Sequence, residues 1–273
     1  MAEGVRLYAG TQDGVVIWRS KNGGWEEVSR SFTGCIMDSI AGCRQHPERV
    51  FLGVTHDGLY RTEDGGHKWT KVLEGDVRSV TIDPTDDKVI YAGTEPVHLY
   101  RSEDGGETWT HLPPLGESML NQDVHGLTVS LSQPTKILAT TPDGVWTSTD
   151  EGNRWLLHGF PRFFERDQIS YCRGVALKAD NPDVIFVGNG DFIPGRTGAI
   201  QRSKDGGKTW EKAALPVEPN STIYWFATHP SDPDVVVANS LNGYVYTSTD
   251  GGDSWQKVAQ EFGEIRAVAW VPN

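Results

Sequence analysis

A short motif recurs six times along this chain, and the repeat constrains the fold more than any other feature of the sequence. A typical copy runs from a Ser or Thr through an acidic residue and a pair of glycines to a tryptophan, as in Ser248-Thr-Asp-Gly-Gly-Asp-Ser-Trp255. The six copies end at Trp25, Trp69, Trp109, Trp155, Trp210 and Trp255. Repeats of about 45 residues are typical of β-propellers and solenoids, in which each repeat forms one structural block.

Each copy of the motif has the composition of a β-hairpin turn. The residues before it, for example Gly58-Leu-Tyr-Arg-Thr62, are rich in the β-branched and aromatic side chains that strands favour. Within the turn, hydroxyl and carboxylate oxygens accept hydrogen bonds from the turn's own amides, glycines adopt positive φ, and the tryptophan packs between sheets. We therefore interpret the motif as structural and do not expect its Asp to be catalytic.

Two further strands precede each hairpin, so the repeat predicts four strands. They are clearest at residues 77–84 and 89–94, where β-branched residues are frequent. Four antiparallel strands in about 45 residues form one propeller blade, and 273 residues hold six such units. The sequence therefore predicts an all-β, six-bladed β-propeller that forms a single domain over residues 1–273, with no helix of useful length.

The two ends of the chain predict one blade assembled from both. Residues 6–11 match the second strand of the repeat, whereas residues 265–270 match the first strand. We expect the C-terminal strand to be the innermost strand of a blade whose other three strands come from the N-terminus. Such closure hides strand edges that would otherwise be open to aggregation.

Composition and charge narrow the class of protein. The chain has 25 basic and 37 acidic residues, and its net charge of −12 disfavours nucleic acid as a partner. No apolar run approaches the ~20 residues of a membrane helix, and the first residues lack a signal-peptide pattern, so we expect no membrane association and a mature chain that starts near Met1. Cys35, Cys43 and Cys172 predict neither disulfides nor a zinc site. We expect a cytoplasmic protein without a cofactor and leave the oligomeric state open.

The repeated Ser/Thr-x-Asp-x-Gly-x-x-Trp hairpins resemble the Asp-box, or BNR, repeats of the sialidase superfamily. The resemblance extends over essentially the whole chain, with Asn22 in place of Asp in the first copy and Glu151 in place of Gly in the fourth. Proteins with these repeats include glycosidases, sortilin-like receptors and photosystem assembly factors. The resemblance implies a propeller and leaves the activity open, because one fold can carry many functions.

One position of the innermost strand is polar in every repeat and differs from repeat to repeat. It stands two residues before an apolar residue that recurs in each copy. The residues at this position are Asp38, Arg78, His125, Arg173, Tyr224 and Arg266. A position with only a structural role should carry similar residues, so the variation favours a ligand at the mouth of the central tunnel, where the innermost strands begin.

Three of these residues are arginines, which predicts an anionic ligand. We expect Arg78, Arg173 and Arg266 to bind a small anionic molecule or acidic sugar through its carboxylate. Further candidates for ligand binding are His56, Glu95, Asn189, Tyr171 and Trp225. The alternative is that the arginines pair with nearby acids and only fill the tunnel. Those acids are Asp76, Asp123, Asp167 and Glu264.

Three histidines are candidate metal ligands together with Glu95: His56, His98 and His125. They come from separate loops and lack a spacing typical of metal sites. We predict no metal site.

Two insertions interrupt the repeat on the face where the innermost strands begin. Residues 159–171 and 189–198 carry several aromatic and basic side chains. The candidates for a lid over the ligand are Phe163, Phe164, Arg166, Phe192 and Arg196. The alternative is an ordinary surface loop whose aromatic rings pack on the blade below.

The sialidase resemblance implies a glycosidase-like hydrolase. The three arginines would hold the substrate carboxylate, with Tyr224 as the nucleophile and Asp38 as the acid. Glu264 or Glu218 would activate the tyrosine. His125 equally suits acid–base catalysis in a lyase or another hydrolase, because the unperturbed imidazole pKa of ~6.5 lies near neutral pH. A non-catalytic protein-interaction or assembly scaffold is the other alternative.

Overall fold

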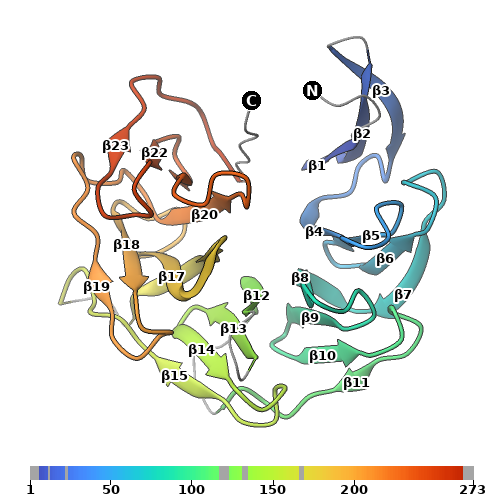
Figure 1. Cartoon of the computed structure of the whole chain (residues 1–273), viewed down its shortest axis with the longest axis horizontal. Helices are drawn as coiled ribbons and strands as arrows, with labels where there is room; N and C mark the ends of the chain where they lie inside the picture. The colour runs from blue at the N-terminus through green and yellow to red at the C-terminus, as the bar shows by residue number, and fades with distance from the viewer. Residues whose placement is uncertain are drawn as a thin grey trace. The chain divides into compact units, whose positions relative to one another are not determined.

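The described part of the chain consists of β-sheets. The computed structural model describes residues 6–11, 13–21, 24–116, 123–130, 135–165 and 169–266. These residues form 23 strands in six antiparallel sheets that follow one another along the chain (Figure 1), and they contain no helix, hence none able to span a membrane. Five sheets have four strands and the first has three. This is the arrangement of propeller blades, so the predicted all-β, six-bladed β-propeller is confirmed.

The chain divides into two compact units with three sheets each, one over residues 1–114 and the other over residues 115–272. The strands of unit 1 are β1 (Arg6–Thr11), β2 (Gly14–Lys21), β3 (Gly24–Ser31), β4 (Met37–Gly42), β5 (Val50–Val54), β6 (Gly58–Thr62), β7 (Thr70–Glu74), β8 (Asp76–Ile82), β9 (Ile90–Glu95), β10 (Leu99–Ser102) and β11 (Thr110–His111). Its sheets are β1-β2-β3, β4-β5-β6-β7 and β8-β9-β10-β11.

Unit 2 repeats this organisation with three four-stranded sheets. Its strands are β12 (Gly126–Ser130), β13 (Lys136–Thr141), β14 (Gly144–Ser148), β15 (Leu156–His158), β16 (Tyr171–Lys178), β17 (Asn181–Gly190), β18 (Gly198–Ser203), β19 (Glu211–Lys212), β20 (Ile223–Thr228), β21 (Val236–Ser240), β22 (Val245–Ser248) and β23 (Gln256–Lys257). The sheets are β12-β13-β14-β15, β16-β17-β18-β19 and β20-β21-β22-β23. The extent of a single domain over the whole chain stays a prediction.

The first sheet lacks the strand that the sequence places at the C-terminus. Strand β1 pairs with β2, and β2 pairs with β3, as expected for the second to fourth strands of the repeat. The predicted innermost strand begins at Ile265, but residues after Arg266 lie outside the described part of the chain. The blade built from both termini therefore stays a prediction.

The core of each unit lies between neighbouring sheets. In unit 1, Phe51, Leu59, Val77 and Ile90 from two adjacent sheets are completely buried against one another. In unit 2, a second cluster joins the last two sheets in the same way, with Phe186, Ile200, Ile223 and Tyr246 at its centre. The apolar faces of stacked sheets thus supply the hydrophobic stabilisation, as in other layered β folds.

Glycines in the second strand of the repeat allow neighbouring sheets to approach closely. A Cβ atom added to Gly53 would lie 2.6 Å from the Val77 carbonyl oxygen, and one added to Gly188 would lie 2.5 Å from the Ile223 carbonyl oxygen. Both distances are far below van der Waals contact. Only glycine fits where the second strand faces the innermost strand of the next sheet.

The repeated motif closes the outer hairpin through a fixed set of hydrogen bonds. In the last copy, the Ser248 hydroxyl donates to the Asp250 carboxylate (2.8 Å) and accepts from the Gly252 amide (2.8 Å). The same carboxylate accepts from the Ser254 amide and hydroxyl, at 2.9 and 2.6 Å. These bonds, with the Ser254 hydroxyl foremost, lower the pKa of Asp250 to about 2. The carboxylate is occupied within its own turn, which fits the structural interpretation.

The fourth copy shows what the glycine pair does. Glu151 stands where the other described copies have glycine, and it adopts φ of 61°, a conformation that side chains other than Gly adopt only at a cost. The Ser148 hydroxyl still donates to Asp150 and accepts from the Gly152 amide. The hydrogen-bond pattern therefore tolerates the loss of one glycine.

We expect Ser248→Ala to lower the free energy of unfolding by about 1–3 kcal/mol, because the substitution leaves the buried Gly252 amide without an acceptor. Ser254→Ala is the matched control. It removes a hydroxyl at an exposed position of the same turn and should cost clearly less. Urea denaturation of both variants measures the difference. Equal losses would mean that the buried amide does not depend on Ser248.

Candidate functional site

The variable polar position of the innermost strands coincides with a β-bulge. The register of β4 with β5 shifts between Met37 and Ser39, which leaves Asp38 as the extra residue. The same shift leaves Arg78 in β8 and Tyr224 in β20 as extra residues. In β16 the shift lies between Cys172 and Val175, the segment that contains Arg173. A bulge turns a side chain out of the regular alternation of its strand, so these residues are freed from sheet packing.

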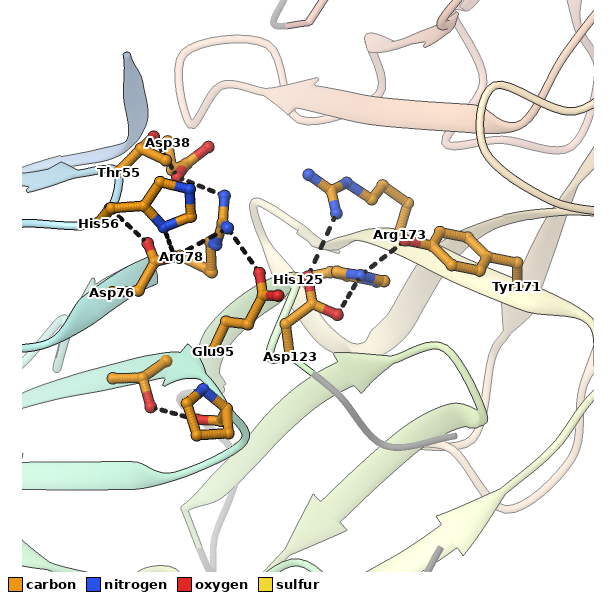
Figure 2. A network of polar contacts seen from close by, with 12 residues as sticks. Asp38, Thr55, His56, Asp76, Arg78, Glu95, Asp123, His125, Tyr171 and Arg173 are labelled. Atoms are coloured by element: carbon orange, nitrogen blue, oxygen red, sulfur yellow. Dashed lines mark hydrogen bonds and ion pairs between the residues drawn. The ribbon is translucent and has the colours of Figure 1, made fainter. Parts of the chain in front are cut away.

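Unit 1 carries the first group of polar side chains, which we call the Arg78 cluster: Asp38, Asp76, Arg78 and Glu95 (Figure 2). One terminal nitrogen of Arg78 donates to Asp38 at 2.9 Å. The other donates to Asp76 at 2.9 Å and to Glu95 at 2.5 Å. A single guanidinium is thus bound by three carboxylates.

Residues of the neighbouring connection hold the carboxylates of the Arg78 cluster in place. The Thr55 hydroxyl donates to Asp38 at 2.6 Å, and the His56 amide donates to Asp76 at 2.9 Å. The His56 ring also lies 2.6 Å from the Asp76 carboxylate, although its side chain is largely exposed. Asp38 and Asp76 are only 12% and 10% exposed, whereas Glu95 is 43% exposed. Glu95 is therefore the most accessible carboxylate of the cluster.

Unit 2 carries the second group, which we call the Arg173 cluster: Asp123, His125, Tyr171, Arg173 and Tyr224 (Figure 2 labels all but Tyr224). Arg173 donates to the Tyr224 hydroxyl at 2.7 Å and lies over the Tyr224 ring at 4.7 Å. It also pairs with the Asp123 carboxylate, at 3.9 Å. The charge of Arg173 is thus balanced less closely than that of Arg78.

His125 is the most deeply buried member of the Arg173 cluster. Its side chain has no exposed surface, and its Nδ1 lies 2.6 Å from the Cys172 carbonyl oxygen. Its Nε2 lies 2.8 Å from Asp123 and 2.9 Å from the Tyr171 hydroxyl. Burial lowers the pKa of His125, and burial raises the pKa of Tyr171 to about 12. Tyr171 is therefore a neutral phenol over the whole working range of a protein.

Four more residues of the sequence prediction lie in unit 2: Asn189, Trp225, Glu264 and Arg266. Glu264 pairs with Arg266 at 2.6 Å, with both side chains about half exposed. Asn189 is buried and donates to the Ser170 hydroxyl at 2.6 Å. Trp225 follows the bulge at Tyr224 and is half-buried. Their predicted roles in ligand binding and catalysis stay predictions.

The predicted lid residues divide into packed and exposed side chains. Lys212 lies over the Phe163 ring at 5.8 Å, and Arg196 lies over the Phe164 ring at 5.0 Å. Phe192 is 64% exposed, and its ring centre lies 6.1 Å from that of Tyr171. Arg166 lies outside the described residues. Phe163 is half-buried, as in a packed surface loop, whereas Phe164 is 39% exposed. Phe192 is available to a ligand beside the Arg173 cluster.

Asp76 and Asp123 were predicted only as possible partners of the arginines, but both are members of the two clusters. Asp76 accepts from Arg78, and Asp123 lies 2.8 Å from the His125 ring. The signal lies in their spacing. Asp76 precedes Arg78, Asp123 precedes His125 and Glu264 precedes Arg266 by two residues each. Pairing of Arg78 with Asp76, of Arg173 with Asp123 and of Arg266 with Glu264 is thus observed, while Asp167 lies outside the described residues.

Within the described ranges, no three or more His, Cys, Asp or Glu side chains gather in a way that could hold a metal ion. Cys35, Cys43 and Cys172 are free thiols, and burial strongly raises the pKa of Cys172. The side chains of both clusters offer hydrogen bonding, charge pairing and proton transfer.

Comparisons with known proteins place the chain among propellers of diverse function. A family model described as Sortilin-Vps10 (sortilin, neurotensin receptor 3) matches residues 143–271. A probable oligoxyloglucan-reducing end-specific xyloglucanase of Neosartorya fischeri is 27% identical over 192 residues, which cover 66% of this chain. The chain spans only 22% of the length of that curated relative. It is similar to a glycoside-hydrolase-like propeller; the sialidase part of the resemblance stays a prediction.

Solved structures give the same fold at lower identity. The GH74 enzyme of Niastella koreensis superposes with a TM-score of 0.70 at 17% identity, over 92% of this chain and 43% of that chain. A structure described as YCF48 bound to D1 peptide superposes with a TM-score of 0.58 at 16% identity, over 92% of this chain and 78% of that chain. At such low identity these similarities establish the fold alone.

We expect Arg78→Gln to lower the free energy of unfolding by ~3 kcal/mol at neutral pH, because it leaves three carboxylates without their shared cation.

Arg101→Gln is the control for this substitution, since Arg101 pairs with the largely exposed Glu103 in the same sheet. It should cost less, because an ion pair with an exposed partner contributes little. Urea denaturation of the wild type and both variants at pH 7 measures the difference. Similar losses for the two arginines would contradict a special role of Arg78 in charge balance.

Proposed function

We propose that this chain is a carbohydrate-binding propeller of the glycoside-hydrolase type and that the Arg78 cluster is its hydrolytic site. The observation that carries the proposal is that Asp76 and Glu95 accept hydrogen bonds from the same nitrogen of Arg78. Hydrolysis of a glycosidic bond uses a pair of carboxyl groups, one as proton donor and one as nucleophile or base. The similarity to a xyloglucanase supports the same reaction class.

The spacing of the two carboxylates suits a retaining mechanism. Oxygens that lie 2.9 and 2.5 Å from one nitrogen are close to each other, on the scale of the ~5–5.5 Å that separates the carboxyl groups of retaining glycosidases. Glu95 is the more exposed of the two and is assigned as the group that approaches the sugar. Asp38 supplies a third carboxylate, and Arg78 keeps its neighbours oriented.

The charge of the Arg78 cluster favours a neutral glycan over an acidic sugar at this site. Three carboxylates surround one guanidinium, so the cluster has a formal excess of negative charge. Carboxylates bind sugar hydroxyl groups well and repel a second carboxylate. An anionic ligand, as predicted from the three arginines, is therefore disfavoured at Arg78.

We expect Glu95→Gln and Asp76→Asn each to reduce hydrolysis of xyloglucan oligosaccharides by at least ~100-fold, the usual contribution of a positioned acid or base. Reducing-end release is measured at equal concentrations of folded protein. Glu103→Gln is the control, because Glu103 is an exposed carboxylate of the same unit paired with Arg101. The proposal fails if the wild type neither binds nor hydrolyses these oligosaccharides, or if Glu95→Gln and Asp76→Asn match the control.

A second candidate function is the binding of a carboxylate-bearing molecule at Arg173. The specific observation is the difference between the two arginines: Arg78 has three carboxylates within 2.9 Å, whereas Asp123 lies 3.9 Å from Arg173. A guanidinium so placed retains more affinity for an incoming anion. A non-catalytic propeller that binds the acidic end of a partner would use the same contact, and the peptide-bound structure with a similar fold supports this version.

We expect glucuronate or acetate to raise the melting temperature of the wild type and to leave that of Arg173→Ala unchanged, since a ligand stabilises only the state that binds it. The melting temperature of the variant without ligand should stay within a few degrees of the wild type. Arg154→Ala is the control, because Arg154 is a largely exposed arginine of the same unit. An unchanged ligand response in Arg173→Ala would contradict binding at this arginine.

A further inference from the structure

The hydrogen-bond partners of His125 determine where its ring protons lie. Its Nδ1 lies 2.6 Å from the carbonyl oxygen of Cys172, and a carbonyl oxygen can only accept a hydrogen bond. Nδ1 must therefore carry a hydrogen. A neutral His125 then presents only a lone pair at Nε2.

This lone pair conflicts with the neighbours of Nε2. The Tyr171 hydroxyl, 2.9 Å away, can donate to it, but a carboxylate oxygen of Asp123 lies 2.8 Å away and has no hydrogen of its own when ionised. An anionic oxygen against a lone pair is repulsive, and burial of the ring removes the water that would screen it. One additional proton, on Asp123 Oδ1 or on His125 Nε2, removes the conflict.

We infer that Asp123 and His125 hold one shared proton between Oδ1 and Nε2 at neutral pH and that this pair is a proton-donating site on unit 2. On donation, the bond from the proton to Asp123 Oδ1 or His125 Nε2 breaks and its electron pair stays on that atom. The proton forms a new O–H bond with the acceptor oxygen of a ligand. The inference extends beyond the glycosidase-type site proposed for the Arg78 cluster and does not depend on it.

The charged and titratable groups around the pair make its two members compete for the proton. Burial lowers the pKa of His125, and the charge of Arg173 lowers it further. The same positive charge, 3.9 Å from Asp123, favours the ionised carboxylate. Tyr171 has a pKa raised to about 12 by burial and stays a phenol. From the next sheet, the Tyr224 hydroxyl accepts from Arg173 and helps to fix it near Asp123. Neither member holds the proton alone, which fits a proton shared between them.

The accessible end of the pair lies beside a cation. The His125 side chain is enclosed, whereas Asp123 is 16% and Arg173 is 20% exposed. An oxygen that binds to the exposed edge of Arg173 would come close to Asp123. A proton donor next to a fixed guanidinium suits a small molecule in which an oxygen gains negative charge, since both groups stabilise that charge.

Proton linkage of folding tests the inference without any ligand. Above pH 7 in the unfolded chain, Asp123 is an ionised carboxylate and His125 is mostly a neutral imidazole. The folded state holds one proton more on this pair, so its stability falls as the pH rises. The unfolding equilibrium constant of the wild type should rise up to tenfold more per pH unit between pH 7 and 9 than that of Asp123→Asn. Tyr171→Phe, which keeps both members of the pair, should follow the wild type. Equal pH slopes for the wild type and Asp123→Asn would overturn the inference.

Nuclear magnetic resonance of the wild type decides the matter even if the variants do not fold. At pH 7, either the Asp123 carboxyl carbon should have the chemical shift of a protonated acid or His125 Nε2 should have that of a protonated nitrogen. A carboxylate shift for Asp123 together with an unprotonated Nε2 would overturn the inference. These measurements are independent of any glycosidase assay, so a failure of one proposal is distinguishable from a failure of the other.

Discussion

The structure depends on the hydrogen bonds that each outer hairpin makes within its own turn. In every described copy, a buried Ser or Thr hydroxyl accepts from a glycine amide two residues beyond the Asp, as Thr62 does from Gly66 and Ser203 from Gly207. The Asp carboxylate accepts from the amides that follow it. The first glycine amide of the turn donates to the connection before the second strand of the same sheet, as Gly251 does to the Asp234 carbonyl oxygen. In the described copies, the polar groups of the turn are thus satisfied within their own sheet. The innermost strands are then free to differ.

Because the outer hairpins stabilise each sheet, the innermost strands can carry unlike residues at one position. Bulges at Asp38, Arg78 and Tyr224, and in the segment that contains Arg173, turn one residue out of each regular strand. A substitution there does not disturb the apolar faces on which the sheets stack. The recurring bulge is thus a fixed backbone position with a variable side chain, which is the arrangement that lets one fold serve different sites.

The sequence was sufficient to predict the blades and to find the variable position, because both follow from periodicity. The 45-residue repeat located the hairpins, and the apolar residues two places after Asp38 or Arg78 gave the correct alignment across strands. Charge balance could not be predicted in the same way. Whether Arg78 meets one carboxylate or three depends on the shared position of Asp38 and Glu95, which come from different strands and different sheets. A bulge also shifts facing residues by one place, so simple strand alternation gives the wrong neighbours.

The two clusters differ in the sign of their charge, and this difference separates their chemistry. In the Arg78 cluster the guanidinium is outnumbered by carboxylates, so the exposed oxygen of Glu95 can accept hydrogen bonds and attracts positive charge. In the Arg173 cluster a shared proton makes Asp123 and His125 neutral together, which leaves the Arg173 charge uncompensated by them. The contacts of Arg173 with the Tyr224 ring and hydroxyl hold the guanidinium in place, so it does not move to pair with a distant carboxylate. An oxygen with developing negative charge is therefore stabilised beside Arg173 and repelled beside Arg78, although the same repeat places both arginines.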